Sequence, residues 1–330
     1  MPKYIIGVDL GTTTTVLSYI APQTGNAPTI LPIPQFTDAE TIESLNYLPS
    51  FIYLGLPNEV YRLPWGQNNP NFVVGSYARK RSTQAPDRTI AASKSWLSHQ
   101  GVDRRKGLLP TNAAEDITKI SAVTAAELIL THVKNAWDAQ FPDAPFIEQQ
   151  IILTIPASFD ASARDLTREA SLNVGYPPSM TILEEPQAAL YAWLATKKES
   201  WRKDLIVGDR ILVIDVGGGT ADFSLIEITN ENNNLSLNRK AVGKHLLVGG
   251  DNMDLALAFY AASKLEEQGH SIDAWQNTAL WHTCRQAKET LLSINDQQTF
   301  KITIAGRGKK LIGGSLSVEL NKEDIKKLLL

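Results

Sequence analysis

The chain has very little cysteine, because Cys284 is the only one among its 330 residues. One thiol excludes an intrachain disulfide and a cysteine-based metal site. The sequence also lacks any apolar run near the roughly 20 residues that cross a bilayer. Asp9 interrupts the apolar stretch that a secretory signal would need at the N-terminus. We therefore expect a cytoplasmic protein without a membrane partner.

Positive charge is also scarce. The formal net charge is -3, and the basic residues gather only briefly, at positions 79–81. Because affinity for a phosphate backbone needs clustered Lys and Arg, we expect no nucleic-acid partner, and we interpret this short cluster as a solvated surface. The 43% hydrophobic share is ordinary for a globular protein. A chain of this length is too long for one small core, which predicts two lobes.

An internal repeat organises the sequence. Residues 5–20 read IIGVDLGTTTTVLSYI, and residues 212–226 read LVIDVGGGTADFSLI. Placing Asp9 on Asp215 also aligns the glycine two positions later and the threonine five positions later. Each copy has the pattern of a strand, a tight turn and a second strand. Two such hairpins predict two related lobes that each present a turn to a shared cleft.

Strands alternate with helices around these two copies, and this alternation makes α/β the expected fold class. Apolar residues at helical spacing predict helices, whereas short runs of β-formers predict strands. A last helix, capped by Asn321, stops without a terminating signal, so we expect more protein to follow. The other expected elements are strands at 150–155 and 180–183, helices at 124–141, 161–173, 187–196, 255–267 and 275–292, and a β pair at 299–320.

Segments with a poorer pattern predict one inserted subdomain in each lobe. We expect a first lobe at 1–197 and a second lobe at 198–330. The first has its core at 1–35 and 118–197 and its insertion at about 36–117. The second has its core at about 205–244 and 319–330 and its insertion at about 245–318.

The two turns suit the binding of a polyphosphate. Backbone N–H groups in a turn without large side chains form an anion-binding concavity. Asp9 and Asp215 each precede such a turn by two residues, and carboxylates there suit a Mg²⁺ that keeps most of its waters. Threonine hydroxyls can donate to phosphate oxygens or hold an attacking water. One such motif alone is more often an ordinary hairpin turn, but two in the same register favour a phosphate clamp.

These turns are similar to the two phosphate motifs of the superfamily that contains actin, hexokinase and the heat-shock-70 (DnaK-type) chaperones. Three further stretches resemble the chaperones in particular: IILTIPASFDASARDLTREA at 151–170, ILEEPQAALYAW at 182–193 and GGDNMD at 249–254. The resemblance runs from residue 4 to the end of the chain and is weakest over 20–75. It implies a nucleotide-binding domain with the two-lobed, actin-like ATPase fold, built on a duplicated ribonuclease-H-like core.

The resemblance also implies a site for ATP or ADP with Mg²⁺. The two phosphate loops would be Gly11, Thr12, Thr13 and Thr14, and Gly217, Gly218, Gly219 and Thr220. Mg²⁺ would be held, largely through its waters, by Asp9, Glu185 and Asp215. The implied catalytic residues are Lys94, Glu185, Asp215 and Thr220, with Asp222 a weaker candidate. Further nucleotide contacts would come from Gly249, Gly250, Asp251, Arg285, Lys288, Glu289 and Leu292.

Several of these positions depart from the family pattern. Gln187 replaces a threonine beside the implied metal carboxylate. Arg285 stands for a glutamate, Glu289 for an arginine and Leu292 for a serine on the helix that would contact adenosine. Losing a stacked arginine predicts weaker selectivity for the base. The family's third glycine-rich loop would lie beyond the last residue.

Three functions follow from these motifs. The first is an ATP-hydrolysing chaperone module whose lobe closure controls a peptide-binding domain outside this chain, with client polypeptides and co-chaperones as partners. The alternatives are a small-molecule kinase of the same superfamily and a regulatory scaffold with weak or no activity. Fold alone cannot choose among them. We favour the hydrolase because a scaffold has no chemical need for Asp9, Lys94, Glu185, Asp215 and Thr220 together.

Overall fold

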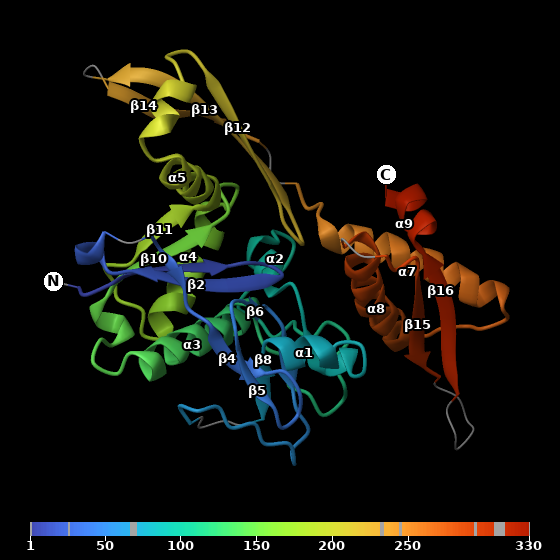
Figure 1. Cartoon of the computed structure of the whole chain (residues 1–330). Coiled ribbons are helices and arrows are strands. Elements are labelled where there is room, and N and C mark those ends of the chain that lie inside the picture. The colour runs from blue at the N-terminus through green and yellow to red at the C-terminus, as the bar shows by residue number, and fades with distance from the viewer. Residues whose placement is uncertain are drawn as a thin grey trace.

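The computed structural model describes residues 2–25, 27–66, 71–231, 234–243, 246–293, 296–306 and 314–329. In Figure 1 the N-terminal half forms a sheet with flanking helices, and the C-terminal elements lie beside it. Of the helices within these ranges, none is long and apolar enough to cross a membrane.

The main sheet of the first lobe places three strand ends at one edge. Its order is β11-β10-β1-β2-β3, and β6 also pairs with β2. Strands β1, β10 and β11 run parallel, so their carboxyl ends meet at the same edge. The strands are β1 (Ile5–Leu10), β2 (Thr14–Ile20), β3 (Thr29–Ile30), β6 (Leu48–Pro49), β10 (Gln150–Ile155) and β11 (Thr181–Glu184).

Helices α3 (Ala122–Gln140) and α4 (Ala161–Asn173) pack against this sheet in one apolar core. A capping side chain determines where each of these two helices begins. Ser121 Oγ accepts a hydrogen bond from the amide of Thr124, and Asp160 does the same from Ala163. The apolar stripe of α3 then faces the sheet, and Trp137 is fully buried there.

The segment between β3 and α3 forms small separate sheets over a second apolar cluster that contains Phe51, Tyr53 and Tyr77. Helix α2 packs on α3 and α4, and a short 3₁₀ helix at Pro86–Arg88 contacts α8 (Ala274–Leu292). The elements here are β4 (Ile33–Phe36), β5 (Ile42–Leu45), β7 (Ile52–Leu54), β8 (Phe72–Val74), β9 (Thr89–Ile90), α1 (Ser76–Arg81) and α2 (Ser93–Ser98).

The second lobe begins with an antiparallel sheet of β12 (Arg210–Val216), β13 (Ala221–Glu231) and β14 (Asn234–Val242). The β12–β13 hairpin is the second copy of the sequence repeat, and β1–β2 is the first. Helix α5 (Glu185–Lys197) contacts both β10 and β12, so it lies between the two sheets (Figure 1). The short α6 (Trp201–Asp204) leads into β12.

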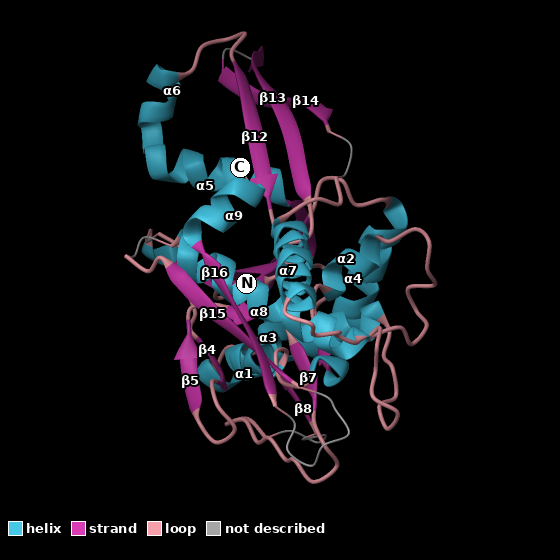
Figure 2. Cartoon of the chain, turned by 90° about the vertical axis from the view of Figure 1, so that its right-hand side faces the viewer, coloured by secondary structure: helices cyan, strands magenta, loops and turns pink. Residues whose placement is uncertain are grey.

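The remaining elements form a separate layer with its own core, which includes Leu257, Leu280 and Ile302. Figure 2 shows α7 and α8 beside the β15–β16 pair. The bounds are α7 (Gly250–Glu267), α8, β15 (Thr299–Ala305), β16 (Ser315–Asn321) and α9 (Lys322–Leu329).

Most predicted elements are confirmed within a few residues, and strand 150–155 and helix 161–173 have the predicted bounds. The predicted start at residue 255 is wrong, because α7 begins at Gly250, where Asn252 accepts a hydrogen bond from the amide of Gly249. The predicted cap is confirmed, since Asn321 Oδ1 accepts from the amide of Asp324 at 2.7 Å. The turn at 307–313 of the predicted β pair lies outside the described residues. The domain boundaries stay predictions.

Candidate functional site

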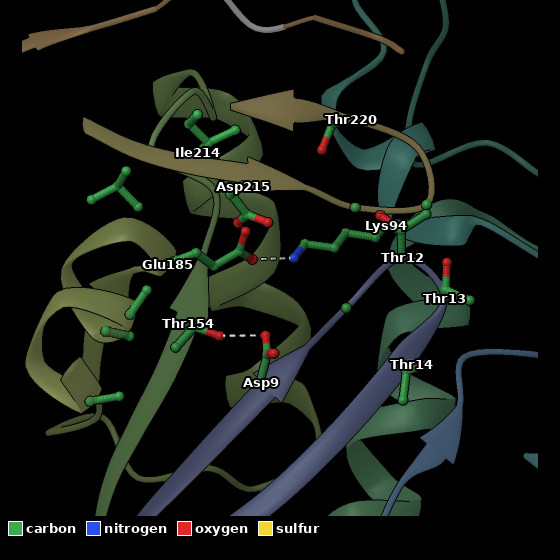
Figure 3. A pocket seen from close by; sticks show the side chains of 17 residues that line it. Asp9, Thr12, Thr13, Thr14, Lys94, Thr154, Glu185, Ile214, Asp215 and Thr220 are labelled. Carbon is green, nitrogen blue, oxygen red and sulfur yellow. Dashed lines mark hydrogen bonds and ion pairs between the residues drawn. The ribbon is translucent and has the colours of Figure 1, made fainter. Parts of the chain in front are cut away.

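A cavity of about 550 Å³ lies between the two copies of the repeat (Figure 3). Its apolar wall comes from α5 and β12, through Ala188, Ala189, Ala192, Val213 and Ile214. The predicted site residues that line it are Asp9, Gly11, Thr12, Thr13, Thr14, Lys94, Glu185, Asp215, Gly217, Gly218 and Thr220. The structure thus brings together the two predicted phosphate loops, the three predicted metal carboxylates and the predicted catalytic lysine.

The carboxylates are placed by the strand ends. Asp9 lies near the end of β1, where it pairs in register with Thr154 of the parallel strand β10. Thr154 Oγ1 donates a hydrogen bond of 2.7 Å to Asp9 Oδ1 (Figure 3). Glu185 follows β11 directly as the first residue of α5, and Asp215 comes from β12 of the other lobe. Strand order and register, rather than sequence distance, therefore bring these side chains to one cavity.

The first phosphate loop is shaped by a glycine and by a serine from another segment. A Cβ at Gly11 would lie 2.2 Å from the carbonyl oxygen of Thr14, so no side chain fits there. Ser50 Oγ donates to the carbonyl of Gly11 at 2.7 Å, and the amide of Ser50 donates to the carbonyl of Thr13 at 2.9 Å. These bonds engage two carbonyl groups of the loop and fix the turn.

The second phosphate loop is a tight turn that meets the first. The amide of Gly217 donates to the carbonyl of Thr220 at 2.8 Å. A Cβ at Gly218 would lie 2.0 Å from Thr13 Oγ1. Because the two loops belong to different lobes, this close approach is an interlobe contact.

Lys94 is nearly buried, with a side chain 8% exposed. Helix α2 carries it toward the cavity, where Lys94 Nζ lies 2.5 Å from Glu185 Oε1. A buried ammonium group requires such a counter-charge. The pair places a cation among three carboxylates at the centre of Figure 3.

Burial sets the electrostatics of these carboxylates. It raises the pKa of Glu185, and the nearby charges of Asp9 and Asp215 add to that rise while Lys94 opposes it. Burial also raises the pKa of Asp215, and the neighbouring Asp222 is the next cause. Each shift means that negative charge is disfavoured here, so a bound cation would relieve it.

The geometry fits Mg²⁺ held through water better than Mg²⁺ held directly. Among the described residues, no three His, Cys, Asp or Glu side chains converge closely enough to ligate a metal ion themselves. Mg²⁺ beside a nucleotide usually keeps several waters, and carboxylates spread around one cavity can hold those waters. Asp9, Glu185 and Asp215 are the residues that would do so.

Eight of the predicted nucleotide contacts do not line this cavity: Gly219, Gly249, Gly250, Asp251, Arg285, Lys288, Glu289 and Leu292. The first turn of α7 instead forms hydrogen bonds with the backbone carbonyls of the second phosphate loop. The amide of Gly250 donates to the carbonyl of Gly217 at 3.1 Å, and the amide of Asp251 donates to the carbonyl of Gly218 at 2.7 Å.

The predicted contacts on α8 have other partners in the structure. Lys288 Nζ donates to the carbonyl of Gly250 at 2.8 Å. Glu289 forms an ion pair with Arg79 of α1 in the first lobe. Arg285 is buried in ion pairs with carboxylates of α7, and Leu292 is 44% exposed.

Sequence reasoning missed Thr154, Ser50 and Asp254. Thr154 is a polar residue near the end of a buried strand, and the rule that parallel strand ends meet could have pointed to it. Ser50 gives no local signal. Asp254 is the last residue of the GGDNMD segment and is 1% exposed. Gln187, the departure beside Glu185, lines a separate hollow with Tyr191 and Arg239 rather than this cavity.

A family model adds to this geometry. The model for the Hsp70 protein family matches residues 5–329. That family comprises chaperone ATPases that bind ATP and ADP, typically with Mg²⁺. The two-lobed, actin-like α/β fold expected from the sequence is confirmed. Because the match spans almost the whole chain, this protein belongs to the Hsp70 family.

Proposed function

We propose that this chain binds Mg-ATP in the cavity of Figure 3 and hydrolyses it to ADP and phosphate. One observation carries the proposal: two glycine-threonine loops, a buried lysine and three carboxylates from both lobes line the same cavity. Each part matches a need of phosphoryl transfer, which depends on positioning and on stabilising charge. Bound Mg²⁺ would supply charge neutralisation at the phosphates.

The residues that line the cavity have different roles in hydrolysis. Lys94 brings a positive charge to the phosphoryl group that is transferred, and its pairing with Glu185 fixes its position. Asp215 and Thr220 face the cavity from the second lobe and would orient the attacking water. A raised pKa suits Asp215 to accept a proton from that water, because a stronger base accepts it more readily.

We further propose that nucleotide-dependent movement of the lobes controls a polypeptide-binding domain outside this chain, in a cytoplasmic protein that acts on client polypeptides with co-chaperones. Family membership supports this chaperone role in general. The contacts of α5 with both sheets supply a physical route, because Glu185 is the first residue of a helix that touches both lobes.

Two measurements test the proposal. Isothermal titration with Mg-ATP and Mg-ADP measures binding, and phosphate release under single-turnover conditions measures hydrolysis. We expect both to be detectable without any added acceptor. Formation of ADP that requires a small-molecule acceptor, and that yields a phosphorylated acceptor in place of free phosphate, would indicate the kinase. No binding heat with either nucleotide at high micromolar concentration would indicate the scaffold. Asp215→Asn is the matched variant, because it keeps the shape of the side chain and removes its charge.

A further inference from the structure

The two phosphate loops are connected by a second path, which does not pass through the cavity. It runs from the first loop through Ser50 and Phe51 to Arg285 on α8, and from there through α7 to the second loop. None of the three side chains in the middle, Ser50, Phe51 and Arg285, lines the cavity.

The first-lobe half of this path is short. Ser50 binds the carbonyls of Gly11 and Thr13, at 2.7 Å and 2.9 Å. Its neighbour Phe51 is 1% exposed, and the carbonyl of Phe51 accepts from the amide of Gly75 at 3.0 Å. The Phe51 ring is therefore fixed relative to the first loop.

The second-lobe half consists of hydrogen bonds and ion pairs. The amide of Asp251 donates to the carbonyl of Gly218 in the second loop at 2.7 Å. Arg285 Nη2 lies 2.5 Å from Asp251 Oδ1, and Arg285 Nε lies 2.8 Å from Asp254 Oδ2. Lys288 Nζ lies 2.6 Å from the other oxygen of Asp254. Together these contacts hold the first turn of α7 against the loop.

Arg285 joins the two halves. Its guanidinium carbon lies 5.4 Å from the ring centre of Phe51 and 5.4 Å from that of Trp281, and its side chain is 5% exposed. Turning this side chain toward the cavity would leave Asp251 and Asp254 without their arginine partner, and unpaired buried charges are costly. Arginine suits the position because its flat fork can pair with two carboxylates while stacking on aromatic rings.

We propose that Arg285 is a positioning residue that holds the second phosphate loop in register with the first. It acts from behind the loops and does not contact the nucleoside. The inference rests on the proposed function, since it assigns how the ATP site is assembled. A glutamate, which the family pattern has where this chain has Arg285, could not pair with Asp251 and Asp254.

The two roles of Arg285 differ in what they predict for a ligand without a nucleoside. A nucleoside contact affects ATP and leaves tripolyphosphate unaffected, whereas loop positioning affects both ligands by the same factor. The experiment is isothermal titration of the parent and variants with Mg-ATP and with Mg-tripolyphosphate. The variants are Arg285→Met and Asp254→Asn, and Asp254 is too deeply buried to contact either ligand.

We expect each variant to weaken both ligands equally, by about tenfold or more, because small displacements of positioning groups have effects of this order. Hydrogen exchange of residues 249–254 should become faster in both variants. The control is Asp324→Asn, which removes an ion pair of 3.1 Å with Lys264 at the other end of α7. It should bind both ligands as the parent does. If Arg285→Met does not stay folded, Arg285→Lys carries the same comparison, because lysine cannot bridge the two carboxylates.

Two results would overturn the inference alone: variants that bind both ligands as tightly as the folded parent, or an Arg285 variant that loses affinity only for ATP. A parent that binds neither ligand would overturn the proposed function, and the inference with it. The parent titration thus separates the two failures.

Discussion

Thr13 and Gly218, which belong to different lobes, lie so close together that a methyl group on Gly218 would come within 2.0 Å of Thr13 Oγ1. The two turns of the sequence repeat therefore touch each other directly as well as lining one cavity. Only the absence of a side chain at position 218 permits this approach.

Gly218→Ala should lower the affinity for Mg-ATP by about tenfold, because the Thr13 hydroxyl must turn away from its place beside the cavity. The free energy of unfolding should change little, since a hydroxyl can rotate. Titration of Gly218→Ala, Thr13→Ala and the double variant measures this coupling. The comparison variant is Gly217→Ala. Its Cβ would lie 3.6 Å from the carbonyl oxygen of Thr220, an ordinary contact distance, so this variant should have a smaller effect. Equal effects of the two alanines would contradict the prediction.

Local sequence patterns predicted the strands and turns of the site. They did not predict its contacts between side chains that are distant in the sequence. The Asp-Gly-Thr repeat identified both loops, because such turns have a fixed composition. The partners of Glu289 and Arg285 could not be predicted. Arg79 precedes Glu289 by 210 positions, and no local sequence pattern indicates a contact over that separation. The early start of α7 was missed because the segment after Gly249 has no apolar stripe. Its helical form depends on a cap and on bonds to the second loop.

Lys94→Ala should leave the affinity for ATP within a few-fold while lowering single-turnover hydrolysis by about 10² or more, because an interaction specific to the transition state acts on the chemical step. The structure adds a stability effect. Removing Lys94 leaves Glu185 largely buried without its counter-charge, which should cost about 3 kcal/mol of unfolding free energy. The variant Lys94→Met with Glu185→Gln should recover that stability without recovering hydrolysis. Hydrolysis at the parental rate in Lys94→Ala would remove Lys94 from the catalytic residues.

The protein should discriminate weakly between ATP and GTP. The two phosphate loops do not read the base, and no residue of α8 in the described chain lines the cavity. Glu289 occupies the position of the family's stacking arginine, and it forms an ion pair with Arg79. Glu289→Arg combined with Arg79→Gln should increase the preference for ATP, because it supplies a guanidinium group that Arg79 does not repel.

Competition binding with ATP and GTP decides this, and Arg79→Gln alone is the control for loss of the ion pair. A strong preference for ATP in the parent, unchanged in the double variant, would show that the base is recognised elsewhere.

Two buried histidines should make the protein less stable in mild acid. His132, whose Nε2 lies 2.9 Å from the carbonyl oxygen of Pro34, has its pKa lowered by burial to about 4. Burial, with Arg285 and Arg79 nearby, lowers the pKa of His282 to about 3. Both rings therefore stay neutral in the folded protein at pH values where the unfolded chain takes up protons.

The sign of the effect follows from the direction of these shifts. Well above pH 6.5 neither state binds these protons, so the stability is fully present. As the pH falls through the unfolded pKa of about 6.5, the histidines of the unfolded state take up protons while those of the folded state stay neutral. Each histidine should cost about 2 kcal/mol of unfolding free energy between pH 7 and pH 5. Denaturant midpoints at these two pH values measure the loss of stability. His132→Gln and His282→Gln should each remove about half of the part of this loss that the two histidines cause. His270→Gln, which changes an exposed side chain, is the control. A loss of the same size in the parent and in both buried-site variants would mean that other groups cause it.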